Sequence, residues 1–461
     1  MNDFPHHAFR EYDIRGIAGT DITEPLAYRL GVAYAGMLKA AGFDSTQPLI
    51  VARDVRLSGP AIQAAVIQGL RDAGHDVLDI GMAPTPLAYY SVYHFEAAGC
   101  VMVTASHNPG EYNGFKLMRG RESLHGEDIG TLARHMQELY CDPAHPFAGE
   151  RKGKLTQTDI IPVYHEQLLR DIHLERPLRV VVDAGNGPSG VVAAPLYRDL
   201  GCEVIELFCE PDGNFPNHHP DPTEEKNLVD VANAVRENGA DIGIAFDGDG
   251  DRIGVVDEHG KVIWGDMLLL LLSRELLKVH PGATIISEVK CSQHMYDDIR
   301  KHGGNGIMWR TGHSPIKAKM KETGAKLAGE MSGHMFFADR YFGFDDATYA
   351  GARILEMLSN HDAPLSGLLD DVPQAVTTPE LRVDCPDEVK FDLVQGAKAH
   401  FSAKGYDIID VDGMRIRFKD GWGLLRASNT QPSLVLRFEA PNEARLAEMR
   451  ELIEGWLRQN I

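Results

Sequence analysis

The order of hydrophobic and polar residues predicts alternating strands and helices over the first three quarters of the chain. Apolar runs at 48–54, 75–81 and 99–106 are typical of buried strands, and residues 61–74 have the apolar spacing of a helix. The alternation continues with a strand that runs into a glycine-rich turn at 178–190, with strands at 202–207, 240–246, 283–287, 306–309 and 325–329, and with helices at 158–172, 266–278, 292–302 and 314–323. Strands that alternate with helices indicate βαβ units and mixed, mostly parallel sheets.

The pattern changes after about residue 374. A helix at 387–403 is followed by short strand-like runs at 406–410, 413–418, 422–427 and 433–439. Asp-Gly pairs at 412–413 and 420–421 are turn signals between antiparallel strands. With a closing helix at 442–457, this last block is predicted to be α+β.

The 461 residues are too many for one hydrophobic core. We therefore predict three consecutive α/β domains and a C-terminal α+β domain, with the boundaries 1–153, 154–257, 258–370 and 371–461.

Composition narrows the function classes. The formal net charge of -21 argues against nucleic acid as a partner, because binding a phosphate backbone needs a basic footprint. A small anionic substrate in a local basic pocket stays possible, and solubility alone also explains the acidity. The six cysteines form no CxxC pair and are expected to be free thiols in a reducing compartment. The N-terminal residues lack a secretory apolar region and the run at 267–272 is too short to span a bilayer, so we expect a cytoplasmic protein with no membrane partner.

The strongest local signal is AFDGDGDRIGVVD at 245–257. Asp247, Asp249 and Asp251 alternate with glycines after an apolar strand, and in an extended chain they would project to one side. Three carboxylates on one side repel one another strongly unless a cation lies among them, and oxygen ligands suit magnesium or manganese. An EF-hand calcium loop is an alternative, although Arg252 stands where that loop needs glycine and the flanks look like strands. A solvated acidic turn is the other alternative.

The stretch VTASHNPGEYNGFK at 103–116 follows another strand. Its Ser106 is either a helix cap or a nucleophile. Ligands in open α/β sheets collect beyond the carboxyl ends of strands, where both Ser106 and the aspartates are expected. We therefore predict that Ser106 carries a phosphoryl group that the cation holds, since phosphoryl transfer depends on positioning and charge neutralisation.

Two further stretches suit a sugar phosphate. GEMSGH at 329–334 offers Glu330, Ser332 and His334 to sugar hydroxyls, or is an ordinary loop with a buried histidine. RASNTQPS at 426–433 offers donors to an anion, or is a plain Asn/Thr turn.

These motifs together resemble the α-D-phosphohexomutase superfamily, and most of all its bacterial bifunctional phosphomannomutase/phosphoglucomutase branch. The resemblance rests on TASHNP (104–109), DGDGDR (247–252), GEMSGH (329–334) and RASNT (426–430), with FREYDIRG (9–16), DGNFPNHHPDP (212–222) and WRTGHS (309–314). It spans essentially the whole chain in family order.

The resemblance implies four domains around a central cleft and an isomerase that interconverts hexose 1-phosphate and hexose 6-phosphate of mannose, glucose or both. It implies a phosphoserine enzyme, one Mg²⁺ per subunit, and a hexose 1,6-bisphosphate intermediate and activator that reorients. The implied catalytic residues are Ser106, His107, Lys116, Arg15 and His313, and the implied metal ligands are Ser106, Asp247, Asp249 and Asp251. The implied substrate-binding residues are Tyr12, Arg252, Lys290, Glu330, Ser332, His334, Arg426, Ser428, Asn429 and Thr430. We expect a monomer whose partners are phosphosugar substrates.

Two positions depart from the family pattern. Gln431 stands where relatives often have Thr, which puts one phosphate contact in doubt, and Ala52 replaces a usual Gly. Met331 is usually Gln in glucosamine-phosphate mutases, which makes that substrate the weaker expectation. A metal-dependent phosphatase and a non-catalytic sugar-phosphate-binding protein are the alternatives from other classes. The sequence leaves open the preferred hexose, the pathway, and which of Lys116 and His313 acts as acid or base.

Overall fold

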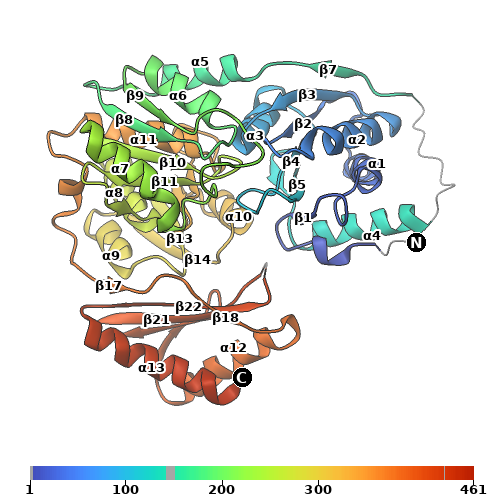
Figure 1. The fold of residues 1–461 in the computed structure, drawn as a ribbon. Coiled ribbons are helices and arrows are strands. Elements are labelled where there is room, and N and C mark those ends of the chain that lie inside the picture. Colours follow the sequence, from blue (N-terminus) through green and yellow to red (C-terminus); the bar gives the residue numbers. More distant parts are fainter. Residues whose placement is uncertain (1–3, 142–150, 430) are drawn as a thin grey trace. The chain divides into compact units, whose positions relative to one another are not determined.

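A computed structural model describes residues 4–141, 151–429 and 431–461 (Figure 1). The chain forms two compact units, which are described separately. Unit 1 extends to Trp264 and takes up Ser332–Ser366, and unit 2 contains Gly265–Met331 and Gly367–Ile461. The chain therefore leaves unit 2 and re-enters unit 1 within the predicted sugar loop.

The first sheet of unit 1 has the strand order β1-β5-β4-β2-β3-β7, and β6 pairs with β5. Strands β4, β2, β3 and β7 run parallel, whereas β5 is antiparallel to β4 and β1. The elements are β1 (Ile14–Ile17), α1 (Glu24–Ala40), β2 (Leu49–Arg53), α2 (Gly59–Asp72), β3 (Val77–Met82), α3 (Thr85–His94), β4 (Gly99–Val103), β5 (Tyr112–Arg119), β6 (Glu122–Ser123), α4 (Glu127–Cys141) and β7 (Leu155–Gln157).

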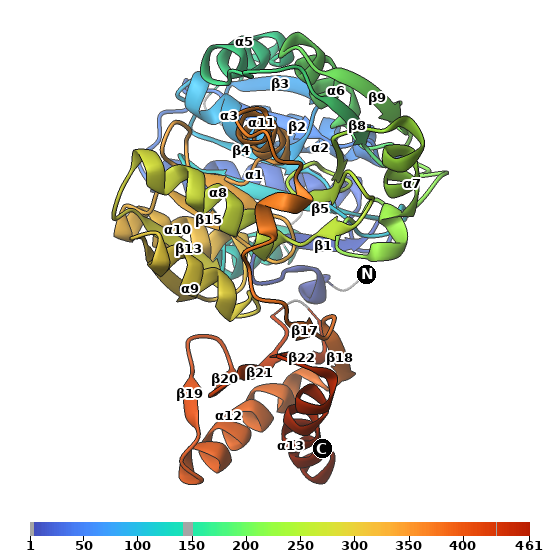
Figure 2. The same cartoon turned by 90° about the vertical axis from the view of Figure 1, so that its left-hand side faces the viewer.

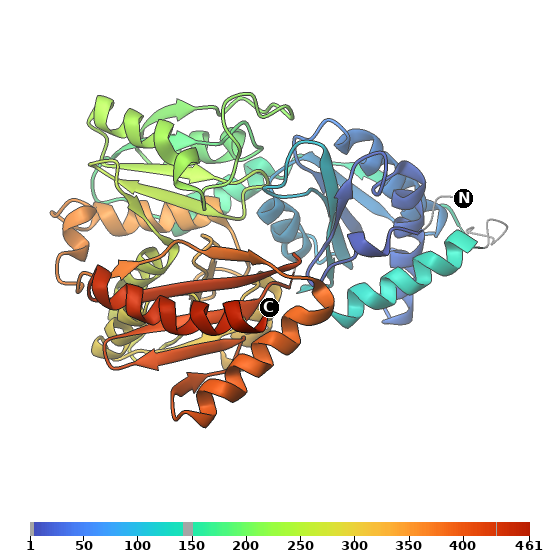
Figure 3. The same ribbon diagram turned by 60° about the horizontal axis from the view of Figure 1, so that its bottom comes forward.

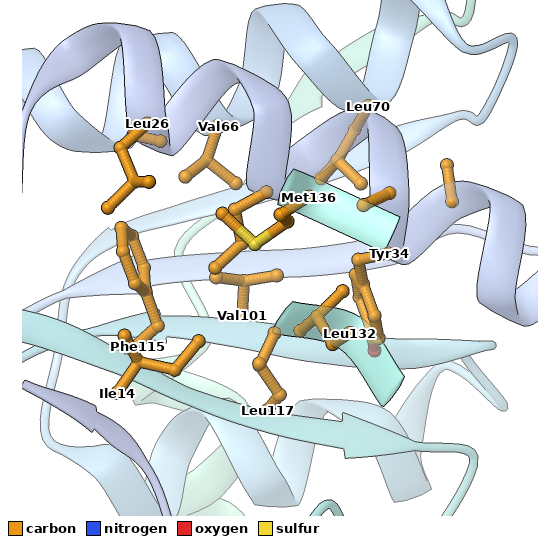
Figure 4. Close-up of a cluster of buried hydrophobic side chains, with 14 of the residues drawn as sticks. Ile14, Leu26, Tyr34, Val66, Leu70, Val101, Phe115, Leu117, Leu132 and Met136 are labelled. Carbon is orange, nitrogen blue, oxygen red and sulfur yellow. The ribbon is translucent and has the colours of Figure 1, made fainter. Parts of the chain in front are cut away.

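One face of this sheet carries a large apolar core. Figure 4 shows Leu26 of α1 and Val66 of α2 directed toward Val101 and Phe115 of the strands. The residues that alternate with Val101 along β4 face the other side of the sheet, where α3 packs on β2 and β4. Because both faces are covered, the strands read as continuous apolar runs.

The second sheet of unit 1 has the order β12-β11-β10-β8-β9, with β9, β8 and β10 parallel and β11 and β12 antiparallel. Its elements are α5 (Ile161–Asp171), β8 (Arg179–Asp183), α6 (Gly190–Asp199), β9 (Glu203–Leu207), α7 (Val229–Asn238), β10 (Ile242–Phe246), β11 (Ile253–Asp257) and β12 (Val262–Ile263). The returning segment supplies β16 (Met335–Phe337) and α11 (Ala347–Ser359), which Figure 2 shows end-on. Helix α11 packs against α6 and β11.

Unit 2 begins with an α/β part in which β14 and β15 are both parallel to β13. Its elements are α8 (Gly265–Val279), β13 (Thr284–Glu288), α9 (Gln293–Lys301), β14 (Asn305–Trp309), α10 (His313–Thr323) and β15 (Leu327–Gly329).

The C-terminal part of unit 2 is an antiparallel sheet of order β17-β22-β21-β20-β19, with β18 paired to β22. Its elements are β17 (Val376–Thr377), β18 (Leu381–Asp384), α12 (Asp387–Ala403), β19 (Asp407–Ile409), β20 (Met414–Phe418), β21 (Gly421–Ala427), β22 (Ser433–Ala440) and α13 (Glu443–Asn460). Helices α12 and α13 pack on the sheet (Figure 3).

The predicted fold class, three α/β layouts and a C-terminal α+β part, is confirmed. One predicted strand, 99–106, is too long, because β4 ends at Val103 and Ser106 has a left-handed backbone with φ 53° that a strand cannot continue. Five cysteines are free and buried, and the side chain of Cys141 lies outside the described ones. Among the described residues, every helix is too short or too polar to cross a bilayer.

Candidate active site

Ser106 lies in the loop 104–111, between β4 and β5. Its side chain is buried, its backbone φ is 53°, and its N–H donates to Thr104 Oγ1 over 2.8 Å. The next element is a strand, so Ser106 does not cap a helix. A non-glycine residue in the left-handed region is strained and needs its surroundings to hold it.

Arg56 holds this loop from within, and sequence reasoning missed it. The guanidinium is fully buried, and Nε donates to Asp54 Oδ2 over 3.0 Å. The two Nη atoms donate to four backbone carbonyl oxygens, those of Ser106, Asn108 and Pro109 in the loop and of Tyr112 at the start of β5, over 2.7, 2.6, 2.6 and 2.9 Å. All five N–H donors of the side chain are thereby used. Asp54 also accepts from Thr104 Oγ1, which links the pair to the Ser106 amide.

The three aspartates lie in the turn 247–252, between β10 and β11. Asp247 Oδ1 accepts backbone N–H groups from Gly250, Asp251 and Arg252 over 3.0, 3.1 and 3.1 Å. The predicted convergence of the carboxylates is confirmed, since one oxygen of each lies within 4.8 Å of the others. The predicted reason is wrong, because a tight turn and not strand alternation brings them together.

Both alternatives for this loop are excluded by its setting. Strands flank it, whereas an EF-hand needs helices. All three aspartates are fully buried, which a solvated turn would not be. A cation fits here because the donors are oxygens and because Asp249 Oδ1 is buried with no hydrogen-bond partner among the described residues. The cluster could therefore hold a metal ion.

Ser106 and Lys116 complete the cluster. Ser106 Oγ donates to Asp247 Oδ2 over 2.9 Å. Lys116, on β5, donates to Asp249 Oδ2 and Asp251 Oδ2 over 2.6 and 2.5 Å. Burial alone would lower the pKa of Lys116, but the two carboxylates outweigh it and raise that pKa. Burial and the neighbouring carboxylates raise the pKa of Asp247 well above its ordinary value.

His107 and Arg15 lie around the serine. His107 Nδ1 is 3.2 Å from Ser106 Oγ, and burial together with the charges of Arg252 and Arg15 lowers the pKa of His107 well below its ordinary value. Arg15 Nη1 donates to Asn108 Oδ1 over 2.9 Å, and Asp13 holds the same guanidinium. Arg15 therefore contacts the serine loop through Asn108.

The end of the predicted sugar loop reaches the aspartate turn. His334 Nε2 lies 3.2 Å from Asp251 Oδ1 and 3.3 Å from Arg252 Nε. Ser332 Oγ is 3.4 Å from His334 Nδ1. Within unit 1 the structure thus brings together Ser106, His107, Lys116, Asp247, Asp249, Asp251, Arg252 and His334.

Unit 2 holds a second group of predicted residues around Lys290. Lys290 Nζ lies 3.0 Å from Glu380 Oε2 and 3.4 Å from Glu288 Oε1. Lys290 lowers the pKa of Glu380 to about 2, whereas burial raises the pKa of Glu288. A buried ammonium with two carboxylates is a site of concentrated charge. Sequence reasoning missed Glu288 and Glu380, because neither stands in a motif.

Glu330, His313 and Arg426 belong to the same unit. Glu330 Oε1 accepts from the Gly312 N–H over 2.6 Å, directly before His313 and α10. Arg426 Nε donates to Asp412 Oδ2 over 3.0 Å, and that oxygen also accepts from the Thr311 N–H over 3.0 Å.

The remaining predicted residues are Ser428, Asn429, Thr430 and Tyr12. The Ser428 N–H donates to Ser433 O over 2.9 Å, and Ser428 Oγ accepts from the Gln431 N–H over 3.1 Å, so Ser428 is held by residues at and just before the start of β22. Asn429 and Tyr12 are half-buried, and Thr430 lies outside the described residues. The roles of all these residues stay predictions.

Comparison with known proteins gives the family. Sequence models of phosphoglucomutase/phosphomannomutase match alpha/beta/alpha domain I at residues 6–138, domain II at 162–260, domain III at 264–376 and the C-terminal domain at 380–455. The phosphomannomutase/phosphoglucomutase of Pseudomonas putida is 44% identical over 454 residues, covering 98% of this chain and 96% of that protein. The phosphoglucomutase of Neisseria gonorrhoeae is 45% identical over 463 residues, covering 100% of this chain and 98% of that protein.

A solved structure agrees. The crystal structure of a phosphoglucomutase/phosphomannomutase family protein from Burkholderia thailandensis has a TM-score of 0.91 at 43% identity, covering 98% of this chain and 97% of that one. The chain therefore belongs to the α-D-phosphohexomutase superfamily, and within it to the bacterial phosphomannomutase/phosphoglucomutase type.

Proposed function

We propose that this chain is an isomerase that interconverts the 1-phosphates and 6-phosphates of mannose and glucose through a phosphoserine at Ser106. The observation that carries the proposal is the hydrogen bond of 2.9 Å from Ser106 Oγ to Asp247 Oδ2, inside a cluster of three buried carboxylates. Family membership supports the reaction class, and the hydrogen bond to Asp247 supports Ser106 as the residue that carries the phosphoryl group.

The reaction consists of two phosphoryl transfers. The free hydroxyl of the hexose phosphate attacks the phosphorus on Ser106, the bond from phosphorus to Oγ breaks, and hexose 1,6-bisphosphate forms. The hydroxyl proton leaves through a base and Oγ gains a proton. After the bisphosphate has reoriented, Oγ gives up its proton to a base and attacks the phosphorus of the other phosphate. The bond from that phosphorus to the sugar oxygen breaks and the sugar oxygen takes up a proton, so the phosphoserine is restored and the isomeric hexose phosphate is released. Covalent storage divides one difficult isomerisation into two positioned transfers.

We propose Mg²⁺ as the cation, held by Asp247, Asp249, Asp251 and the Ser106 phosphate. Its chemistry would be to neutralise the charge that the transferred group develops. The unpartnered Asp249 Oδ1 supports this, since a buried carboxylate oxygen without a donor is costly unless a ligand satisfies it.

The other roles follow the sequence prediction. We propose that Glu330, Ser332 and His334 bind sugar hydroxyls and that Arg426, Ser428, Asn429 and Thr430 bind the phosphate that is not transferred. Tyr12, Arg252 and Lys290 would contact substrate, Arg15 and His107 would act beside the serine, and Lys116 and His313 remain the two candidates for proton transfer. The buried charges at Lys290 and Arg426 support a substrate that carries anionic groups.

A coupled assay tests the function. Purified protein with Mg²⁺ and a trace of glucose 1,6-bisphosphate should convert both mannose 1-phosphate and glucose 1-phosphate to their 6-phosphates, with glucosamine 1-phosphate slower. Release of inorganic phosphate without isomerisation would mean a phosphatase and would overturn the proposal.

Four expectations about the whole protein also remain proposals. They are the domain boundaries at 153, 257 and 370, a monomeric state, the absence of a nucleic-acid partner and a cytoplasmic location. The net charge of -21 supports the third, and the buried free cysteines support the fourth.

A further inference from the structure

The segment from Asp212 to Pro222 carries the motif DGNFPNHHPDP and has no role in the proposed reaction. It follows β9 in unit 1, and we call it the brace. Its start packs on the serine loop and its end packs on the aspartate turn. The brace therefore contacts both loops of the candidate active site.

The first contact is with the residues that hold the serine loop. A Cβ added to Gly213 would lie 2.3 Å from Val55 O, so only glycine allows this approach. The Phe215 ring centroid lies 5.6 Å from Arg56 Cζ, the same guanidinium that binds the carbonyls of the serine loop. The Gly110 side of that loop faces the brace as well, since a Cβ there would be 3.5 Å from Gly213 O.

The second contact is with the aspartate turn. The Gly248 N–H donates to Pro220 O over 3.1 Å. A Cβ on Gly248 would lie 2.5 Å from Ser106 O and 3.3 Å from Pro220 Cγ, so the brace, the turn and the serine backbone meet at this glycine. The position of Pro220 therefore bears directly on the turn that carries Asp247 and Asp249.

His218 fixes the end of the brace through both ring nitrogens. Nε2 lies 3.1 and 3.0 Å from the two carboxylate oxygens of Asp183, and Nδ1 lies 3.0 Å from His219 O. Asp183 is fully buried, and its Oδ1 also accepts from the Gly185 N–H over 2.9 Å. Both nitrogens thus face acceptors. A neutral imidazole has a single N–H and would direct a lone pair at one of them, whereas an imidazolium satisfies both.

We propose that His218 is a positioning residue: as an imidazolium held between Asp183 and His219 O it fixes Pro220, and through the bond from Gly248 to Pro220 it fixes the aspartate turn beside Ser106. The proposal rests on the function proposed for that turn. His218 touches neither substrate nor cation in this account, and acts only through the backbone of Pro220.

The arrangement responds to pH. Among the described residues, the charged groups that act on His218 are Asp183, at the end of β8, and Asp230, on α7. The Cys209 thiol lies near Asp183, and burial raises the pKa of that thiol to about 12. Burial alone lowers the pKa of His218, but the carboxylates outweigh it, so the pKa lies above its ordinary value of 6.5. The brace is therefore fully stabilised below about pH 6.5 and loosens as the pH rises through the folded-state pKa.

Hydrogen exchange followed by mass spectrometry tests the proposal without relying on activity. The peptide that covers 245–254 reports the Gly248 amide. After correction for intrinsic rates, its exchange in the wild type should rise from about pH 6.5 to about pH 9. The variant His218→Gln should exchange about tenfold faster at the lower pH and show little further rise. His219→Gln, the same change at the next residue, should behave like the wild type.

Calorimetric titration with Mg²⁺ alone is the second readout, and it should show affinity about tenfold weaker in His218→Gln than in His219→Gln. Equal protection of 245–254 in both variants, with no pH-dependent rise in the wild type, would overturn the brace. The wild-type pH series needs no substitution, so it tests the pH response of the brace even if a variant fails to fold. A catalytically inactive protein with the expected exchange pattern would instead count against the proposed function alone.

Discussion

Ser106 Oγ donates a hydrogen bond of 2.9 Å to Asp247 Oδ2, although the two residues lie 141 positions apart in the chain. Ser106 follows a strand of the first sheet and Asp247 a strand of the second. The fold of unit 1 thus places a hydroxyl at the edge of a cluster of carboxylates that could hold a metal ion.

The first prediction concerns the metal. Asp249→Asn should weaken Mg²⁺ binding about tenfold or more, because it removes one anionic ligand and places an amide beside Lys116 and Thr85, which now donate to Oδ2. Calorimetry on chelator-treated protein measures this, and Asp392→Asn, an exposed change on α12, is the matched control. Full activity of metal-free wild-type protein, verified by elemental analysis, would show that no cation is needed.

The second prediction concerns Arg56. Arg56→Lys keeps the charge but cannot reach four carbonyl groups, so Ser106 should lose its fixed backbone and accept phosphate from glucose 1,6-bisphosphate at least about tenfold more slowly. Arg353→Lys is the matched control. It removes a guanidinium from another largely buried ion pair, in which Arg353 Nη2 lies 2.9 Å from Asp339 Oδ2. Both variants should have lower melting temperatures, but only Arg56→Lys should slow phosphorylation in a quenched time course read by mass spectrometry. Equal phosphorylation rates would reduce Arg56 to a purely structural residue.

The third prediction concerns the phosphate clamp. If both isomers place their nonreacting phosphate at Arg426, then Arg426→Ala should weaken glucose 1-phosphate and glucose 6-phosphate by similar factors, on the order of tenfold for a lost charge-assisted contact. Calorimetry on a Ser106→Ala background prevents turnover. Arg445→Ala, at an exposed pair with Asp420, is the control and should change neither affinity. A large loss for one isomer with none for the other would contradict a shared clamp.

The fourth prediction concerns acid stability. Lys290 lowers the pKa of Glu380 from 4.5 to about 2, so the pair stabilises unit 2 fully above about pH 4.5 and loses that contribution as the pH falls toward 2. Glu380→Gln should lower the free energy of unfolding at pH 7 by about 1–2 kcal/mol, since the side chain is partly exposed. It should also flatten the dependence on pH between about 4.5 and 2. Urea titrations at several pH values measure both quantities. If the free energy of unfolding of the variant fell with pH as steeply as that of the wild type, this pair would not be the cause of the acid sensitivity.

Much of the fold can be predicted from the sequence, because apolar periodicity and turn residues are local signals. The helix predicted at 387–403 coincides with α12, and the Asp-Gly pairs lie at the turns before β20 and β21. Motif order also gave the aspartate turn and Ser106. These features depend on short runs of residues whose periodicity or turn chemistry is visible in the chain itself.

The supporting residues were not accessible in this way. Arg56 acts through carbonyl groups some fifty residues distant, and those groups carry no side-chain signature. The pairing of Lys116 with Asp249 depends on β5 running antiparallel to β4, and no strand was predicted there. His218 stands in the motif DGNFPNHHPDP, yet its partner Asp183 is 35 residues away in the chain. Long-range contacts of this kind require the folded backbone.

Direct phosphorylation decides whether Ser106 carries the phosphoryl group. Wild-type protein is incubated with excess glucose 1,6-bisphosphate, desalted, and analysed by intact mass and peptide mapping, beside Ser106→Ala and the exposed control Ser402→Ala. We predict one stable phosphate on Ser106 in the wild type and in Ser402→Ala, none in Ser106→Ala, and its transfer to product when glucose 1-phosphate is added. Turnover by unphosphorylated Ser106→Ala at the wild-type rate, or a phosphate mapped to another residue, would contradict the account.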